Sequence, residues 1–387
     1  MQKWLPIILP LLFFSCQKEP NAKQDLSPQD QSKIEQQRGD LEASDFKWGY
    51  INKKGQLTIK AKFDECKNFV EERALVRLKD SWGYLDTKGD LIILAQYQEA
   101  YDFSNGLAVV KAYGEKYRYI NQDGQAITEA IYDEAKSFSD GLAAVRVNNN
   151  WTYINLEGKE LDVPAFTEAY YFKDGLAKVQ IKGKFGLVDQ NLAWVIEAKY
   201  DKIGPIDETL ILVELDQKQS YINRSGQFVF QSQYDKAYSF SYGYAPFKSN
   251  GLMGIINENN EIILEAQYPD IMVAGQDRFF IFQDGYFGMI DMTGSTLIPT
   301  EMGTILPIKE GKTACMKDDY WAIFDQDGQQ LSSFEYGLVW SYADGLARVA
   351  LFSGIGFVNH EGQIVIEPGY IDVNDFSNNL ARVQLYE

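Results

Sequence analysis

The strongest constraint on the fold is a unit of about 34 residues that recurs along almost the whole chain. The first residues of its copies are Trp48, Trp82, Tyr117, Trp151, Phe185, Gln219, Met253, Phe287, Trp321 and Ile355. Eight of the nine intervals are 34 residues long and one is 35. A fixed period in this range indicates a solenoid, a propeller or an array. Residues 48–387 are therefore predicted to form one domain of ten repeats, although the length of 387 residues alone would suggest two or three domains.

Each repeat has the pattern of short antiparallel strands. The third and fourth residues of a copy are apolar or aromatic, as in Tyr84-Leu85, which indicates a strand covered on both faces. An Asn or Asp follows in all ten copies, and Gly stands three residues later in eight of them, which is typical of a tight hairpin turn. An apolar run, an aromatic residue, a Ser-x-Gly turn and Leu-Ala-x-Val complete the unit. We expect about four antiparallel strands per repeat, in an all-β meander.

The repeat resembles that of the WG-repeat (KWG-type) proteins. Their unit reads Trp-Gly-Tyr-Ile-Asx-x-x-Gly, an apolar run, Tyr-Asp, and then Phe-Ser-x-Gly-Leu-Ala-x-Val; Trp82-Gly83 and Tyr132-Asp133 are intact examples here. The match covers 48–387 and implies an all-β repeat protein of the envelope or surface, similar to lipoproteins of Bacteroidota. The family carries no catalytic motif that can be transferred to this chain.

The two ends of the repeat region bear on whether the repeats close into a ring. The first copy starts at Trp48 without a clear partner strand before it, and the last copy ends in 380–386, the strand type that elsewhere precedes the Trp strand. Pairing these ends would close a propeller-like ring and hide both edges. An open β superhelix explains the repeats equally well, and ten units exceed the usual four to eight blades of a propeller. The ring is slightly favoured.

The amino terminus resembles that of a bacterial lipoprotein. Residues 1–15 place Lys3 before an apolar run too short to span a bilayer, as in a signal peptide, and Ser15-Cys16 follows it like a lipobox. Cys16 is then the lipid attachment site, and 16–47 are the lipidated Cys and a flexible tether; the alternative is a secretory signal with an incidental Cys. Gln17-Lys18-Glu19 resembles a surface-export signal or is plain tether. We therefore predict an outer-membrane lipid anchor, with the protein facing the periplasm or the cell surface.

Composition and motifs argue against several classes of function. The net charge of −18 repels phosphate backbones, so no nucleic-acid partner is expected. His360 is the only histidine and lies in a turn, which excludes a Ser-His-Asp triad or a multi-His zinc site. We predict no catalytic residue, no cofactor and no metal, and hence no enzyme. A two-carboxylate glycosidase is left open because Asp and Glu are plentiful.

Cysteines and aromatic residues are assigned by their phase in the repeat. Cys66 and Cys315 replace small buried residues and are expected to be free buried thiols, with a disulfide as the alternative. Trp and Tyr at recurring positions are expected to be core, whereas a glycan-binding role would need them exposed. Better candidates for exposure lie outside the recurring phase: Tyr113, Tyr171, Tyr242, Tyr244 and Trp340.

Candidate partner-binding residues lie where copies five, seven and eight replace the Gly-Leu turn. These loops span 204–209, 274–278 and 308–312 and contain Glu208, Thr209, Gln276, Asp277, Arg278, Lys309, Glu310 and Lys312. Loops on a repeat scaffold are the usual site of function, although neutral drift would give the same pattern. The predicted function is a lipid-anchored, non-enzymatic binding scaffold for protein or another macromolecule. The alternative is a carbohydrate-binding or carbohydrate-cleaving surface lipoprotein.

Overall fold

The computed structural model describes residues 46–161, 165–206 and 208–386. Residues 46–387 form one compact unit, and the predicted signal peptide 1–15, Cys16 and most of the predicted tether lie outside the described residues. The described residues are all β, without a helix that could span a membrane. The first strand begins at Phe46, two residues before the predicted start of the repeats.

The strands of the described residues form nine antiparallel sheets. One sheet joins the chain ends: β2 (Leu57–Phe63), β1 (Phe46–Asn52), β36 (Leu380–Tyr386) and β35 (Asp372–Val373). The next has six strands: β3 (Glu65–Val70), β4 (Arg73–Leu78), β5 (Ser81–Leu85), β6 (Leu91–Ala100), β7 (Leu107–Ala112) and β8 (Tyr117–Asn121). Then follow β9 (Glu134–Ala135), β10 (Leu142–Val147) and β11 (Asn150–Asn155), and the sheet of β12 (Glu168–Ala169), β13 (Leu176–Ile181), β14 (Lys184–Asp189) and β15 (Trp194–Tyr200).

The remaining five sheets follow the same order along the chain. They are β16 (Lys202–Ile203), β17 (Leu210–Leu215), β18 (Lys218–Asn223), β19 (Phe228–Gln231); β20 (Lys236–Ala237), β21 (Tyr244–Ser249), β22 (Leu252–Asn257), β23 (Ile262–Tyr268); and β24 (Asp270–Gly275), β25 (Arg278–Gln283), β26 (Tyr286–Asp291), β27 (Thr296–Met302). The last two are β28 (Thr304–Ile305), β29 (Lys312–Lys317), β30 (Tyr320–Asp325); and β31 (Leu338–Val339), β32 (Ala347–Leu351), β33 (Gly354–Val358), β34 (Ile364–Tyr370).

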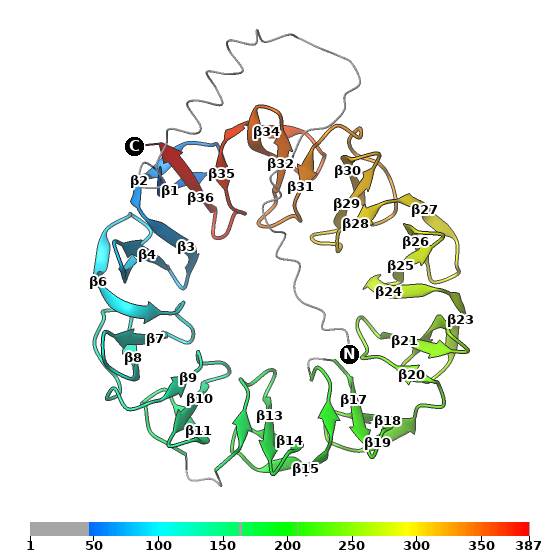
Figure 1. The fold of residues 1–387 in the computed structure, drawn as a ribbon, viewed down its shortest axis with the longest axis horizontal. Coiled ribbons are helices and arrows are strands. Elements are labelled where there is room, and N and C mark those ends of the chain that lie inside the picture. Colours follow the sequence, from blue (N-terminus) through cyan, green and yellow to red (C-terminus); the bar gives the residue numbers. More distant parts are fainter. Residues whose placement is uncertain (1–45, 162–164, 207, 387) are drawn as a thin grey trace. The chain divides into compact units, whose positions relative to one another are not determined.

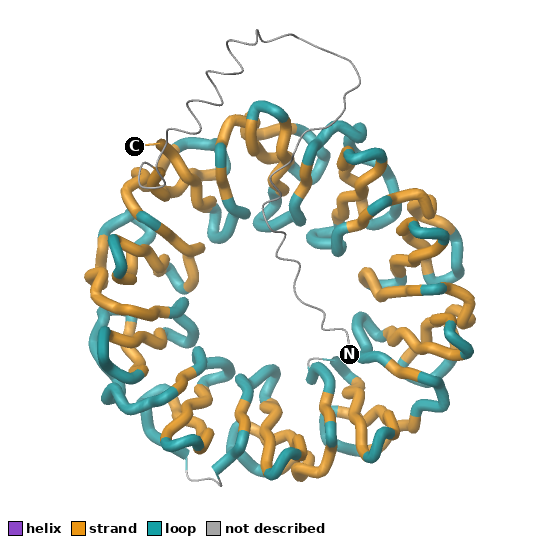
Figure 2. The backbone as a smooth tube through the Cα atoms, viewed as in Figure 1, coloured by secondary structure: helices purple, strands orange, loops and turns teal. Residues whose placement is uncertain are grey.

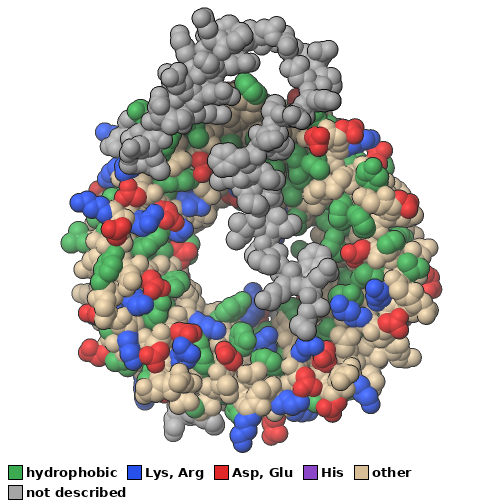
Figure 3. Space-filling view, viewed as in Figure 1, with side chains coloured by type: hydrophobic (Ala, Val, Ile, Leu, Met, Phe, Trp, Pro, Cys, Tyr) green, Lys and Arg blue, Asp and Glu red, His purple; other side chains and the backbone are tan. Residues whose placement is uncertain are grey.

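The ten repeats form nine sheets instead of ten because two neighbouring sheets are merged. Their strands together make the six-stranded sheet. Its ten-residue strand β6 pairs with β5 through Leu91–Tyr97 and with β7 through Tyr97–Ala100. The sheets stand around a central opening, and the parts of the chain nearest to it are mostly loops (Figures 1 and 2). The opening is also seen in the space-filling view of the described residues (Figure 3). Each sheet combines the end of one repeat with the start of the next, as β12 and β13 do with β14 and β15.

The ring is closed by the first and last strands of the chain. β1 pairs with β36 along its whole length, from Phe46 opposite Tyr386 to Asn52 opposite Leu380 (Figure 1). From β36, Arg382 reaches the next sheet, where its Nη1 donates to the Cys66 carbonyl oxygen at 2.6 Å and its Nε to Asn68 Oδ1 at 3.0 Å. The predicted propeller-like ring is confirmed, because no β edge is left at either end of the repeat region.

Buried tyrosines at the third position of a repeat link neighbouring sheets. Each hydroxyl donates to a main-chain carbonyl oxygen further along the chain: Tyr50 to Lys67 at 2.7 Å, Tyr84 to Tyr101 at 2.8 Å, Tyr119 to Lys136 at 2.6 Å, Tyr153 to Tyr170 at 2.5 Å and Tyr221 to Tyr238 at 2.6 Å. The bond from Tyr84 lies within the six-stranded sheet, and the other four reach the following sheet. Burial raises the pKa of all five tyrosines. These recurring aromatics are core residues, as predicted, and each buried hydroxyl has a hydrogen-bond partner.

Glycine at the second position of a repeat lets the fourth strand of the sheet cross close to the third. The glycines are Gly49, Gly83, Gly186, Gly254, Gly288 and Gly356. At Gly83 a Cβ would lie 2.6 Å from the carbonyl oxygen of Ile93 and 2.7 Å from the amide nitrogen of Ala95, so only hydrogen fits. All six glycine-containing copies have a regular fourth strand.

Three copies depart from the predicted four strands for the same steric reason. Their second residues are Arg118, Thr152 and Ala322, and the segments after β8, β11 and β30 pair with these strands only through isolated bridges. A fourth copy carries Ser220, and its strand β19 has only four residues. A side chain at this position leaves no room for the close crossing, so the local sheet has fewer regular strands.

The two described cysteines are buried and free, as predicted. Cys66 lies in β3 and Cys315 in β29, and neither side chain is exposed to solvent. Burial raises the pKa of each thiol to about 12, so both stay protonated and unreactive in the folded protein.

Candidate functional site

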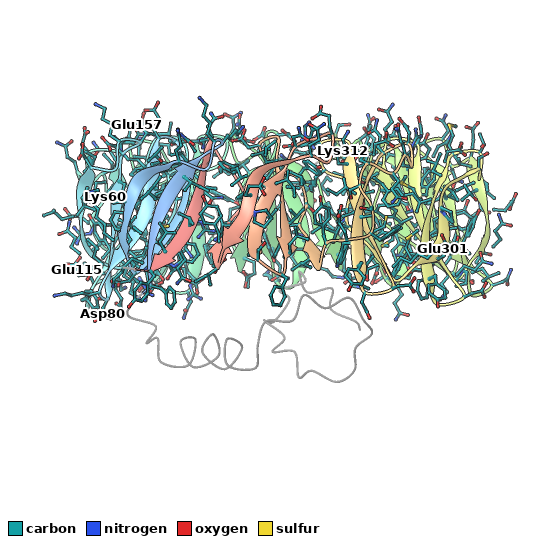
Figure 4. All side chains as sticks on the ribbon, turned by 90° about the horizontal axis from the view of Figure 1, so that it is seen from above. Lys60, Asp80, Glu115, Glu157, Glu301 and Lys312 are labelled. Atoms are coloured by element: carbon teal, nitrogen blue, oxygen red, sulfur yellow. The ribbon has the colours of Figure 1, made fainter. Side chains whose placement is uncertain are left out.

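The ring has two faces that carry different turns. One face carries the Ser-x-Gly turns and the Asx turns between the third and fourth strands, and we call it the Asx-turn face. The other carries the hairpins between the second and third strands, and we call it the hairpin face. In the side view, Glu157 and Lys312 lie on the Asx-turn face, and Asp80 and Glu115 lie on the hairpin face (Figure 4).

Turns on the Asx-turn face are tied to one another across sheet boundaries. The middle residue of a Ser-x-Gly turn accepts a hydrogen bond from a backbone N–H of the next such turn: Asn105 from Gly141 at 2.8 Å, Asp140 from Gly175 at 2.8 Å, Glu310 from Gly345 at 3.0 Å and Asp344 from Asn379 at 2.6 Å. Much of this face is therefore a fixed frame, and a ligand site must be sought where the pattern is broken.

The candidate residues around Glu310 belong to this frame. The turn from Lys309 to Lys312 keeps the hydrogen bonds of the consensus turn, with the N–H of each of these two residues donating to the carbonyl oxygen of the other. Glu310 accepts from Gly345 and also lies 2.9 Å from His360 Nε2. The replaced residues in this copy therefore keep the geometry of the consensus turn, because Glu310 and Gly311 adopt the same positive φ angles as the consensus residues.

Arg278 is also used within the protein. Its Nε donates to the Gln326 carbonyl oxygen at 3.0 Å, and its Nη2 lies 2.6 Å from Asp327 Oδ1 in the Asx turn of the next sheet. Arg73 makes the equivalent contact to the Gln122 carbonyl oxygen at 3.4 Å. Arg73 in the first repeat thus occupies the position of the consensus Leu, as Arg278 does in copy seven. The sequence comparison considered only copies five, seven and eight and did not include this first copy.

The remaining candidates divide between two loops. Thr209 is exposed and Glu208 half-buried in the turn between β16 and β17, and neither lines either of the two cavities described below. Gln276 is exposed and Asp277 half-buried in the turn between β24 and β25. These two residues line the cavity described next.

A cavity of about 470 Å³ opens on the Asx-turn face at the boundary between the β20–β23 and β24–β27 sheets. Its lining comes from three turns: Tyr242, Gly243 and Tyr244; Asn257, Glu258 and Asn259; and Gln276 and Asp277. The first two turns belong to the β20–β23 sheet and the third to the next sheet. The three turns meet on the Asx-turn face at the boundary between these sheets. The lining holds two carboxylates and no Lys or Arg.

Hydrogen bonds fix part of this lining and leave the rest available. Tyr244 Oη donates to Asp277 Oδ1 at 2.5 Å, and this bond, together with burial, raises the pKa of Tyr244 to about 12. Asn257 Oδ1 accepts the backbone N–H of Asn259 at 3.0 Å, which holds the Asx turn. Among the described residues, the side chains of Glu258 and Gln276 have no hydrogen bond or ion pair, and Tyr242 is 60% exposed. The free groups are thus an aromatic ring, a carboxylate and an amide.

A second cavity, of about 450 Å³, is lined by Tyr101, Ala135, Lys136, Ser137, Phe138, Ser139 and Tyr171. Its polar groups mostly serve the protein. Lys136 Nζ donates to the Ala169 carbonyl oxygen at 2.8 Å and lies 4.8 Å from the ring centres of Trp151 and Tyr170, and burial lowers its pKa. Ser139 Oγ donates to the Phe172 carbonyl oxygen at 2.6 Å. This cavity is the weaker candidate.

Three of the five aromatics predicted to be exposed are exposed. These are Tyr113, Tyr171 and Tyr242, whereas Tyr244 and Trp340 are half-buried, the latter under the Arg348 guanidinium at 4.4 Å. Sequence reasoning singled out Tyr242 and Tyr244 but did not join them to Gln276 and Asp277. It missed Asn257, Glu258 and Asn259 altogether. The available signal was the stretch Ser-Tyr-Gly-Tyr at 241–244, where other copies have Asn or Asp and then Leu.

The fold defines the chain as a closed β-repeat ring of the propeller type. The chain belongs to the WG containing repeat family, which matches residues 48–81, 82–117, 117–151, 151–185, 185–218, 220–252, 253–286, 321–351 and 355–387. The copy that starts at Phe287 is outside the matched ranges. No group of three or more His, Cys, Asp or Glu side chains in the described part of the chain is placed to hold a metal ion.

Similar solved structures are remote in sequence. A eukaryotic initiation factor is 12% identical over 74% of this chain and 94% of its own, with a TM-score of 0.46. BamB from Moraxella catarrhalis is 12% identical over 84% of this chain and 98% of its own, with a TM-score of 0.30. The computationally designed Ika8 protein is 12% identical over 77% and 93%, with a TM-score of 0.31. We found no match among curated proteins.

Proposed function

We propose that this protein is a non-enzymatic binding scaffold of the bacterial envelope, and that the cavity at Tyr242, Glu258 and Asp277 receives a basic side chain of a partner protein. The observation that carries the proposal is the lining of that cavity. It combines two carboxylates with two tyrosine rings and contains no cation of its own. An Arg or Lys side chain satisfies all of these groups at once.

The physical chemistry favours a cation over an anion or a neutral group. An arginine can pair with Glu258 through charge-assisted hydrogen bonds and stack on the exposed ring of Tyr242. The chain's net charge of −18 adds a long-range attraction for a basic partner. We assign no reaction to the cavity, because the Tyr244 hydroxyl, with a pKa of about 12, stays protonated at neutral pH and Asp277 is engaged by it.

We expect the full-length protein to bind immobilised peptides that contain Arg or Lys and to bind acidic peptides of equal length at least tenfold more weakly. Glu258→Gln and Tyr242→Ser should each weaken binding of the basic peptides by about five- to tenfold, through lost charge and lost stacking. Tyr113→Ser is the matched control, because it removes a similarly exposed tyrosine from another sheet, outside both cavities. Peptide binding is measured by surface plasmon resonance at two salt concentrations, and equal binding by all variants would refute the proposal.

The alternative of carbohydrate binding is favoured by one feature of the same site, because an exposed Tyr ring beside amides and carboxylates also suits a sugar. A glycan array with the same variants separates the two. Neutral glycans that bind the wild type, resist high salt and depend on Tyr242 but not on the charge of Glu258 would support this alternative. Binding of basic peptides that falls with salt supports the first proposal.

The anchoring of the scaffold is part of the proposal. We propose that Cys16 carries lipid in the outer membrane, and that the ring faces the periplasm or the cell surface. Cys16→Ser should leave the protein unprocessed or in the aqueous phase after detergent partitioning, because the acyl chains provide the membrane affinity. A mutant of unchanged mass that stays in the detergent phase would refute the anchor. Protease treatment of intact cells reports which side the ring faces.

A further inference from the structure

An arc of exposed apolar side chains runs along the hairpin face, opposite the cavity. It consists of Leu252, Tyr286, Tyr320, Phe352, Ile371 and Tyr386, and we call these six residues the apolar arc. They belong to five consecutive sheets, from β20–β23 through the closing sheet. Tyr286 is 50% exposed, Tyr320 53% and Phe352 fully. Exposed apolar side chains that recur from sheet to sheet over half the ring are unusual for a surface that faces only water.

The repeat register shows a difference between the two halves of the ring at one hairpin position, although Tyr113 is also exposed in the hairpin between β7 and β8. Leu252, Tyr286 and Tyr320 are the first residues of β22, β26 and β30. These three residues stand directly before the first residue of their copies. At that position the earlier copies carry polar residues: Lys47, Ser81, Lys116, Asn150, Lys184 and Lys218. The same hairpin position is therefore polar on one side of the ring and apolar on the other.

The arc has the geometry of a surface that meets a plane. Equivalent positions of successive sheets in a ring lie at the same height, and the side view shows the hairpin residues Asp80 and Glu115 along the same edge (Figure 4). Tips arranged in this way can touch a flat surface together, as a bilayer requires. Tyrosine and phenylalanine are also the side chains that settle at the boundary between lipid tails and headgroups.

The first described strand of the ring begins on this face. β1 begins at Phe46, which pairs with the arc residue Tyr386, and their rings lie 6.0 Å apart. The residues between Cys16 and Phe46 therefore connect to the ring beside the arc. A chain of that length reaches on the order of 30 Å, so a lipid on Cys16 would hold this face within reach of the bilayer.

We propose that the apolar arc docks the ring onto the lipid bilayer in which it is anchored, so that the Asx-turn face and its cavity point away from the membrane. This inference rests on the proposed lipid anchor at Cys16. Asp284, Asp318 and Asp319 lie in the same hairpins as Tyr286 and Tyr320 and reside among the headgroups. Their negative charge disfavours anionic lipid, so docking is strongest on zwitterionic phosphatidylethanolamine and phosphatidylcholine.

The test places one environment-sensitive dye on the arc and one at the equivalent polar position. Tyr320→Cys and Asn150→Cys occupy the same hairpin position in opposite halves of the ring, and the buried thiols of Cys66 and Cys315 do not compete for the label. The lipidated full-length protein is reconstituted in phosphatidylcholine and phosphatidylethanolamine vesicles. We expect quenching by spin-labelled lipid to be roughly twofold or more greater at position 320 than at 150, and quenching by aqueous iodide to show the reverse order.

Each outcome decides between the two proposals. Lipid on Cys16 by mass spectrometry, with both dyes equally open to iodide, overturns the docking face and leaves the anchor. No lipid on Cys16, with the dye at 320 still quenched from the bilayer, overturns the anchor and leaves the docking face. A protein that does not bind vesicles overturns both. The dye at 320 could instead be protected from iodide only after envelope extract is added, without being quenched by spin-labelled lipid. That result would overturn docking onto the bilayer in favour of docking onto a protein partner.

Discussion

Val383→Asp is expected to unfold the whole ring, with a loss of about 4 kcal/mol or more in the free energy of unfolding. Val383 lies in β36 and has no exposed surface, so the substitution buries a carboxylate without a partner. The loss approaches the total stability of an ordinary domain. It should spread beyond the local sheet because β36 joins the last repeat to the first. Calorimetry and far-UV circular dichroism measure it.

Tyr386→Ser serves as the matched control in the same strand, because this side chain is exposed and its loss should change stability by no more than ~0.5 kcal/mol. A second measurement addresses the closure itself. Lys47 and Leu385 are directly paired between β1 and β36, so a Lys47→Cys, Leu385→Cys double variant should form a disulfide within one chain. Cys66 and Cys315 stay free in either case. Persistence of free thiols at both introduced cysteines after oxidation, or a Val383→Asp variant that melts like the wild type, would contradict the closed ring.

Gly83→Ala is expected to destabilise the protein by about 3 kcal/mol, although alanine is normally the better residue in a strand. The new methyl carbon would lie 2.6 Å from the carbonyl oxygen of Ile93, and the atoms in its way belong to the backbone and cannot rotate aside. Either β5 or β6 must move, which disrupts their pairing from Trp82 to Leu85. Chemical denaturation with a two-state fit measures the change.

The control for this prediction uses the same position in another copy. Ser220 occupies the second position of its repeat, where the fourth strand is short, and Ser220→Ala should change stability by less than ~0.5 kcal/mol. If Gly83→Ala were neutral or stabilising, the close crossing of β6 over β5 would not be the reason for the glycine. Equal losses in both variants would point to a general effect of the substitution.

Much of the fold was predictable because the repeat encodes it locally. The recurrence of Asx-x-x-Gly and Ser-x-Gly placed the turns, and the buried pair Tyr84-Leu85 placed an interior strand. The reduction of the fourth strand in three copies was not predicted. It depends on the space beside Arg118, Thr152 and Ala322, which becomes visible only when the third and fourth strands are placed side by side.

The candidate site was predicted only in part. Gln276 and Asp277 line the cavity, but Arg278 and Glu310 proved to hold neighbouring turns together. Departure from a consensus marks positions that differ, and it does not distinguish a residue that binds a ligand from one that makes another internal contact. That distinction requires the partner of each side chain.

The sequence by itself determined the all-β class, the ten repeats and the core positions, because each depends on periodicity and on turn residues within a few positions of one another. The tertiary structure alone decided that β36 pairs with β1, that three turns enclose the cavity and that apolar tips gather in one half of the hairpin face. These features join residues from different sheets. Their contacts depend on the rotation between successive sheets. Packing across the whole ring sets this rotation, and no single repeat encodes it.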